Sequence, residues 1–331
     1  MSLTEIWPFI IPGLLYGIGA LGIAITYRYL RFPDFTVLGS VVLGAIVCVN
    51  VANSYNPVLA VIAGVLAAGA LGLITALLHC RLGIDRVLAG ILTYTASFTF
   101  SYLLTSGGSI DLKPGRLVLF PQSLGLDLAL TCVIAIILIG VITMVIRSSY
   151  GSLVLAMTAS NGFVEHRHRY KDRVFAILLV LGNMIVGLAS CLYAAHDRVA
   201  NVISHQDFLP VSLGAIFGGN AVAMFLAHKI MKVSVGTTDP AHTTPTPESG
   251  PGHLAVVLRR AFSPQGDDTK ELGYILCANV LGAVLIMVIT GLSGIPTVSR
   301  LLHLSSGGEW QYMIAATLTV IAIWWADARG Q

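Results

Sequence analysis

Long runs of apolar residues, separated by short polar connections, dominate the pattern along the chain. Nine of these runs contain no charged residue, and each has about the ~20 residues that a helix needs to cross ~30 Å of hydrocarbon. They cover residues 8–26, 35–52, 57–78, 87–105, 128–146, 174–195, 208–227, 272–290 and 310–326. A helix satisfies its own backbone hydrogen bonds in lipid, whereas strands of a membrane barrel would alternate apolar and polar residues. The pattern predicts an all-α polytopic membrane protein with about nine transmembrane helices.

Two stretches leave the number of crossings open between eight and ten. The run at 35–52 is the weakest of the nine, because polar residues such as Thr36 and Ser40 stand near its start. The half-polar stretch 291–309 has room for a short re-entrant helix.

The basic residues give the orientation of the chain. When alternate connections are assigned to opposite sides, 15 of the 19 Lys and Arg residues fall on one side. Basic residues concentrate on the cytoplasmic side of membrane proteins, so the N-terminus is expected outside and the C-terminus in the cytoplasm. Because no basic residue precedes the first apolar run, that run is expected to stay as a helix rather than be cleaved as a signal peptide.

The chain is expected to form a single transmembrane domain over residues 1–331, with two long cytoplasmic connections. The first, 147–173, has an apolar middle and a strongly basic end. The second, 228–271, contains a Pro/Thr-rich insert at 236–252 that cannot bury apolar area and is expected to be disordered.

The composition argues against several kinds of chemistry. Hydrophobic residues make up 56% of the chain and charged residues 11%, against about 25% charged in soluble domains. No phosphate-binding loop, zinc-protease signature or nucleophile elbow occurs, so we expect no enzymatic activity in this chain. His166 and His168 stand two apart without a well-placed carboxylate, so no metal site is expected. The net charge of +3 is attributed to loops facing anionic membrane lipid, not to nucleic-acid binding.

The apolar runs offer neutral polar groups only. Coupled carriers usually keep an acidic residue within the membrane to bind the driving ion. Here residues such as Asn50, Thr93 and Asn183 can hydrogen-bond a passing solute or a neighbouring helix, and both interpretations stay open for each residue. A polar path without its own energy source indicates a pore-forming subunit driven by a partner.

Three segments carry a resemblance to a known family. Residues 27–40, YRYLRFPDFTVLGS, resemble the R-x-L-x-F-P-D-L-T-V-D-G-S stretch of an uncharacterised family of ABC transporter permeases, relatives of the branched-chain amino acid and ribose permeases. Residues 88–93, LAGILT, are similar to its L-L-A-G-I-L-T segment, and Arg147-Ser148-x-x-Gly151 is similar to its R-T-x-x-G segment. The resemblance extends from about residue 10 to about residue 230.

The resemblance implies a permease subunit of an ABC importer in the bacterial inner membrane, moving an amino acid or similar small solute. It implies three partners: a cytoplasmic ATPase that binds ATP and magnesium, a periplasmic or lipoprotein solute-binding protein, and a second copy or an unlike permease. This chain itself is expected to hold no cofactor. The alternative is a self-sufficient secondary carrier or channel.

The resemblance also assigns roles to residues. The connection 147–173 corresponds to the loop that couples the permease to the ATPase, with Arg147, Gly151, Ala156 and Asn161 at matching positions. The loop departs from the family because an arginine before Ala156 is lost and a basic run at 166–173 replaces the usual continuation. Candidates for the translocation path are Asp34, expected at its cytoplasmic edge, together with Ser40, Asn50, Thr93, Thr95 and Asn220.

Overall fold

The computed structural model describes residues 7–30, 34–105, 108–115, 124–148, 168–202 and Phe208. Six helices and two short strands occur among these residues. They are α1 (Trp7–Leu30), α2 (Thr36–Ala52), α3 (Pro57–Leu82), α4 (Arg86–Thr105), β1 (Ser109–Asp111), α5 (Leu124–Arg147), α7 (His168–Asp197) and β2 (Val199–Asn201). Five of the helices, all except α2, are long and apolar enough to cross a membrane.

The described helices coincide with the first six predicted apolar runs, which confirms the mostly helical architecture in this part of the chain. The run at 35–52 forms a helix, but at 17 residues it is the shortest of the six. The predicted runs at 208–227 (apart from Phe208), 272–290 and 310–326 and the connection 228–271 lie outside the described residues. The total of nine crossings and the sides of both termini therefore stay predictions.

Local sequence sets the ends of α3. Asn56 caps its start by accepting a hydrogen bond from the Val58 amide at 2.9 Å, and Pro57 stands in the first turn, where its missing N–H costs nothing. Gly83 ends the helix with a φ of 69°, a left-handed conformation that glycine adopts without strain. Asp85 then caps the first turn of α4. A short turn thus joins α3 and α4 as antiparallel neighbours.

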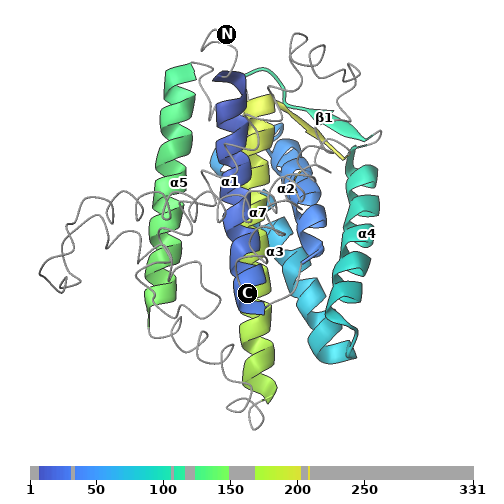
Figure 1. Ribbon diagram of the computed structural model, residues 1–331. Helices are drawn as coiled ribbons and strands as arrows, with labels where there is room; N and C mark the ends of the chain where they lie inside the picture. Colours follow the sequence, from blue (N-terminus) through green and yellow to red (C-terminus); the bar gives the residue numbers. More distant parts are fainter. Residues whose placement is uncertain are drawn as a thin grey trace, which may run out of the picture.

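The helices are arranged around α1 and α7 (Figure 1). In this view α5 lies beside α1 on one side, and α2, α3 and α4 lie on the other. The two strands pair antiparallel, Asp111 opposite Val199, at the end of the bundle where α1 begins. Asn53, which follows α2, is bonded to the β1 segment: its Nδ2 donates to the Asp111 carbonyl at 3.0 Å, and its Oδ1 accepts from the Lys113 amide at 2.8 Å. The end of α2 is therefore fixed to the strand pair.

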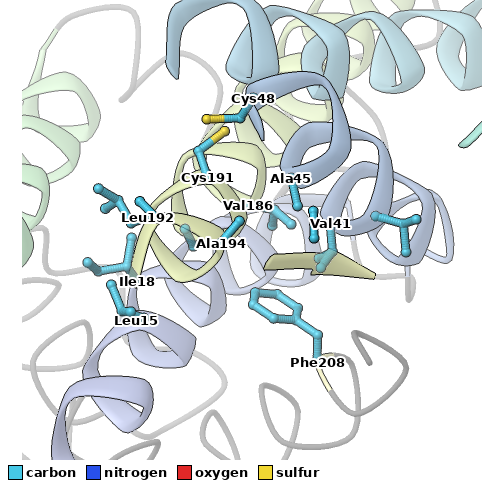
Figure 2. Packing of buried hydrophobic residues seen from close by; sticks show 14 of the residues in the cluster. Leu15, Ile18, Val41, Ala45, Cys48, Val186, Cys191, Leu192, Ala194 and Phe208 are labelled. Atoms are coloured by element: carbon cyan, nitrogen blue, oxygen red, sulfur yellow. The ribbon is translucent and has the colours of Figure 1, made fainter. Parts of the chain in front are cut away.

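Three helices, α2, α3 and α7, approach each other closely through small residues, and we call this contact the three-helix seam. The buried face of α3 carries a small residue at every fourth position, which places these residues in one row along the helix. They are Ala60, Gly64, Ala68, Gly72 and Ala76. Beside this row α2 and α7 run parallel. Their facing residues keep one separation in sequence: Ser40 bonds Asn183, 143 residues later, and Cys48 and Cys191, at the same separation, lie next to each other in Figure 2.

The seam is tightest at Gly64. A Cβ atom there would collide with the Cys191 Sγ and would lie only 2.6 Å from the Gly44 carbonyl oxygen of α2. Both Cys48 and Cys191 are fully buried beside it. Glycine at this position allows the backbones to come into van der Waals contact, which is the main source of helix association in lipid.

We expect the substitution Gly64→Ala to destabilise the protein by about 1–3 kcal/mol, because the added methyl group must push α2 and α7 away from α3. The matched control is Gly140→Ala on α5, where a Cβ meets no described atom within 4 Å. The apparent melting temperature of each purified variant in detergent measures the effect. Equal melting temperatures for the two variants would contradict the close packing described here.

Candidate functional site

Polar side chains meet inside the bundle where α2 begins beside α7. Asp34, which precedes α2, is only 2% exposed. Its Oδ1 accepts a hydrogen bond from the Thr36 amide at 2.9 Å, and its Oδ2 accepts one from Asn183 Nδ2 at 2.8 Å. The Asn183 Oδ1 in turn accepts from Ser40 Oγ at 2.6 Å. Residues from the turn, α2 and α7 thus share one hydrogen-bond network.

A chain of three hydroxyl groups extends this network to α3 and α4. Thr36 Oγ1 lies 2.7 Å from Thr75 Oγ1, which donates to Thr93 Oγ1 at 2.9 Å. Thr93 Oγ1 donates its single proton to the Ala89 carbonyl at 2.9 Å. Because each hydroxyl has one proton, Thr75 has none left for Thr36, so Thr36 is the donor in the remaining bond. We call the six residues of the two networks the polar centre: Asp34, Thr36, Ser40, Thr75, Thr93 and Asn183.

The polar centre lies deep within the bundle. At 1.5 Å per residue, Asn183 is about 21 Å from the Asp197 end of α7, and Thr75 is about 10 Å from the Leu82 end of α3. Asp34 was expected at the cytoplasmic edge of the path because it stands outside the apolar runs. Its side chain bonds the middle of α7, and its position relative to the membrane surface stays a prediction.

The carboxylate of Asp34 is stabilised by N–H donors. Burying a charged group is costly unless it is hydrogen-bonded or paired. The Asp34 carboxyl group accepts hydrogen bonds from the Thr36 amide and the Asn183 side-chain amide. These two bonds, one to each oxygen, fix the position of the carboxyl group.

The inner face of α4 continues the polar centre towards β1. Buried hydroxyl groups occur at every fourth position, and they are Thr93, Ser97, Ser101 and Thr105. Thr105 Oγ1 accepts from the Gly108 amide at 3.0 Å, whereas Ser101 Oγ is buried without a hydrogen-bond partner in the described part of the chain. The outer face of α4 is apolar and exposed. A helix of a soluble protein is apolar inside and polar outside, and α4 shows the opposite arrangement. This is typical of a helix that faces lipid on its outer side.

The structure brings together three of the residues predicted for the translocation path. Asp34 and Ser40 are joined through Asn183, and Thr93 is joined to them through the hydroxyl chain. Asn50 is half-buried about 15 Å further along α2, and exposed Thr95 bonds only the carbonyl of its own helix at Ile91. The roles of all five residues in transport stay predictions.

Most of the residues predicted for ATPase coupling lie outside the described residues. Arg147 is the last residue of α5, and α7 begins at His168, so residues 168–173 at the end of the predicted coupling loop 147–173 are helical. Gly151, Ala156 and Asn161 in that loop lie outside the described residues, as does the path candidate Asn220.

Sequence reasoning missed Thr36 and Thr75 and noted Asn183 without choosing it. A signal for Thr75 was present, because it is the only residue in the run 57–78 whose side chain can hydrogen-bond. A lone polar group in a long apolar helix needs a partner on another helix, which here is Thr36 and Thr93.

Comparison with known proteins places this architecture in a family. Residues 8–248, more than half of the chain, match the family described as branched-chain amino acid transport system / permease component. The chain belongs to this family. The match confirms the resemblance seen in the sequence, and together with the apolar helices it makes the chain a multi-pass membrane permease.

One curated relative shares a shorter region. The tyrosine transport system permease protein of Clostridioides difficile (strain R20291) is 35% identical over 100 residues, which is 30% of this chain and 34% of that protein. The alignment thus spans about a third of the length of the relative. No solved structure matches the chain.

We expect the substitution Thr75→Val to lower the stability of the permease by about 1 kcal/mol, because it leaves the Thr36 hydroxyl without its acceptor inside an apolar bundle. The matched control is Thr95→Val, which removes only a bond to the carbonyl of its own helix. Thermal unfolding of both variants in detergent measures the difference. An unchanged midpoint for Thr75→Val would mean that the hydroxyl chain contributes nothing to stability.

Proposed function

We propose that this permease is the membrane subunit of an ABC importer that carries an amino acid or a similar small solute into a bacterial cell. The observation that carries the proposal is the family match over residues 8–248, which covers the six described helices except for Trp7. A separate cytoplasmic ATPase supplies the energy by hydrolysing ATP with magnesium. A periplasmic or lipoprotein binding protein delivers the solute, and a second permease, identical or unlike, completes the path.

The named relative supports an amino acid as the solute. It is described as a tyrosine transport permease, and its similarity to this chain reaches 35% over the aligned region. The polar centre offers hydroxyl, amide and carboxylate groups, which suit the polar parts of an amino acid. We therefore take tyrosine and the branched-chain amino acids as the first solutes to test.

The described charges support the proposed orientation in the inner membrane. Arg81 lies in the last turn of α3, Arg86 begins α4 and lies over Phe175 of α7, and Arg173 lies near the start of α7. Lys113 and Arg198 flank the strand pair at the other end of the bundle. Together with the bias over the whole chain, this favours a cytoplasmic position for the end where α7 begins. The coupling loop then faces the ATPase.

Reconstitution into liposomes tests the proposal. The permease is combined with the ATPase and binding protein encoded beside it, and uptake of radiolabelled tyrosine, leucine and valine is followed with and without ATP. ATP-dependent uptake of one of these solutes is expected. If the reconstituted complex takes up none of these three amino acids with ATP, the proposal is rejected.

One observation favours the alternative of a self-sufficient carrier. The buried carboxylate of Asp34 is the kind of group to which coupled carriers bind a proton or cation, and the apolar runs themselves contain none. Liposomes that contain the permease alone separate the two functions. Uptake driven by a proton or sodium gradient without ATPase indicates a carrier, whereas no uptake is expected for an ABC subunit.

We expect the substitution Gly151→Glu in the predicted coupling loop to abolish most ATP-dependent uptake, by about tenfold or more, because an acidic side chain at the docking loop disrupts contact with the ATPase. The matched control is Gly250→Glu in the Pro/Thr-rich insert, which adds the same charge on the same predicted side. Uptake per mole of complex is the measurement. Normal uptake by the Gly151→Glu complex would remove the coupling role from this loop.

A further inference from the structure

Both polar atoms of the Asn183 side chain are hydrogen-bonded. Nδ2 donates one hydrogen bond to Asp34 Oδ2 at 2.8 Å and another to the Leu179 carbonyl of its own helix at 2.9 Å. Oδ1 accepts from Ser40 Oγ at 2.6 Å. A backbone carbonyl only accepts hydrogen bonds, so the bond to Leu179 fixes which end of the amide is the donor. A flipped amide would place Oδ1 against the carboxylate.

The contacts of Asn183 reach α3 as well as α2. The Ser40 hydroxyl lies 3.3 Å from the Ala68 carbonyl of α3. A Cβ atom at Gly72 of α3 would lie 3.1 Å from Asn183 Nδ2, so this glycine makes room for the amide. All three helices of the seam therefore meet at Asn183.

Small residues alone do not fix how α2 and α7 are aligned lengthwise. The row Ser40, Gly44 and Cys48 faces the row Asn183, Gly187 and Cys191, and both rows repeat every four residues. Sliding α2 by one turn towards its own N-terminus would still bring small residues together, Gly44 then facing Asn183. It would, however, place Ser40 opposite Leu179 and leave Asp34 without its amide partner. A buried polar pair selects one alignment among several that apolar packing permits.

We propose that Asn183 is a positioning residue that holds α2 and the hydroxyl chain to α7 in a single alignment. This role rests on the importer function proposed above: the last six residues of the predicted coupling loop 147–173 belong to α7, which begins at His168, so a displacement of the loop moves α7. Through Asn183 that displacement reaches Asp34, Ser40 and the polar centre. Without the Asn183 bonds, α7 slides along α2 and no longer carries α2 with it. ATP is then hydrolysed without a corresponding amount of solute being transported.

An exchange of the two side chains tests the pair. The Asn183→Asp variant places two carboxylates against each other. In the double variant Asp34→Asn with Asn183→Asp the amide donor and the carboxylate change places, and the bonds from Thr36 and Ser40 are kept. Both variants lose the bond from residue 183 to the Leu179 carbonyl, so they differ only in the pairing of residues 34 and 183. The measurement is the amount of solute transported per ATP hydrolysed by the reconstituted complex with its ATPase and binding protein.

We expect Asn183→Asp to lower this ratio at least fivefold, and the double variant to recover at least half of it. The matched control is Ser190→Ala, which removes a buried hydroxyl of α7 that bonds the Gly187 carbonyl of the same helix. Its ratio should equal that of the natural protein. A normal ratio for folded Asn183→Asp, or a folded double variant without recovery, overturns the proposal. If Asn183→Asp fails to fold, a folded and coupled double variant supports the pair, and an unfolded one overturns it.

Cross-linking gives a readout that does not depend on transport. Cys48 and Cys191 are free thiols whose sulfur atoms lie side by side between α2 and α7 (Figure 2). In a chain whose other cysteines are replaced by alanine, oxidation by copper phenanthroline should join them, and mass spectrometry detects the linked peptides. Asn183→Asp should reduce the yield at least fivefold, and the exchange should restore it. An unchanged yield in Asn183→Asp contradicts the role in alignment.

The two readouts separate failure of this inference from failure of the proposed function. If the natural complex transports no solute with ATP, the importer proposal is lost, while cross-linking still reports whether Asn183 aligns α2 with α7. If transport depends on ATP but neither readout responds to Asn183→Asp, only the inference about Asn183 is lost.

Discussion

Close approach of helix backbones in the three-helix seam is the constraint on which the rest of the described structure depends. Lipid tails are as apolar as the helix surfaces, so association must come from packing and from hydrogen bonds between helices. The small residues of α3, with Gly64 at the tightest point, let α2 and α7 come near enough for short side chains to bond across the gap. The bond between Ser40 and Asn183 at 2.6 Å exists because neither side chain has to reach far.

The apolar pattern predicted the described helices well but not their ends. Residues in lipid must be apolar, and this rule marks the membrane-embedded part of each helix. The helices themselves continue beyond it: α5 begins at Leu124 and includes buried Asp127, and α7 begins at His168, before the run that starts at residue 174. A helix can end wherever water or side chains bond the unpaired N–H and C=O groups of its last turn. The hydrophobicity of the sequence does not indicate where this happens.

The candidate site could be predicted only in part. Ser40 and Thr93 were recognisable as polar residues inside apolar runs, and Asp34 as part of the family motif. Their common location depends on the alignment of α2 with α7, which are 143 residues apart at this contact, and on the lateral order of the helices. The periodicity within one segment indicates neither how two helices are aligned nor which helices are neighbours. For the same reason the apolar runs indicated a bundle without carboxylates, although the turn before α2 places the Asp34 side chain inside it.

The short length of α2 has a consequence for the surrounding bilayer. Its 17 residues span about 26 Å, less than a typical hydrocarbon core of ~30 Å. Helices usually adapt to membrane thickness by tilting or by drawing lipid towards their ends. α2 has protein contacts at both ends, with Asp34 and Asn183 at one and the Asn53 bonds to the β1 segment at the other. The longer outer helices must therefore adapt to a thicker or thinner membrane. The position of α2 relative to its protein contacts then does not depend on the thickness that the lipids give the membrane.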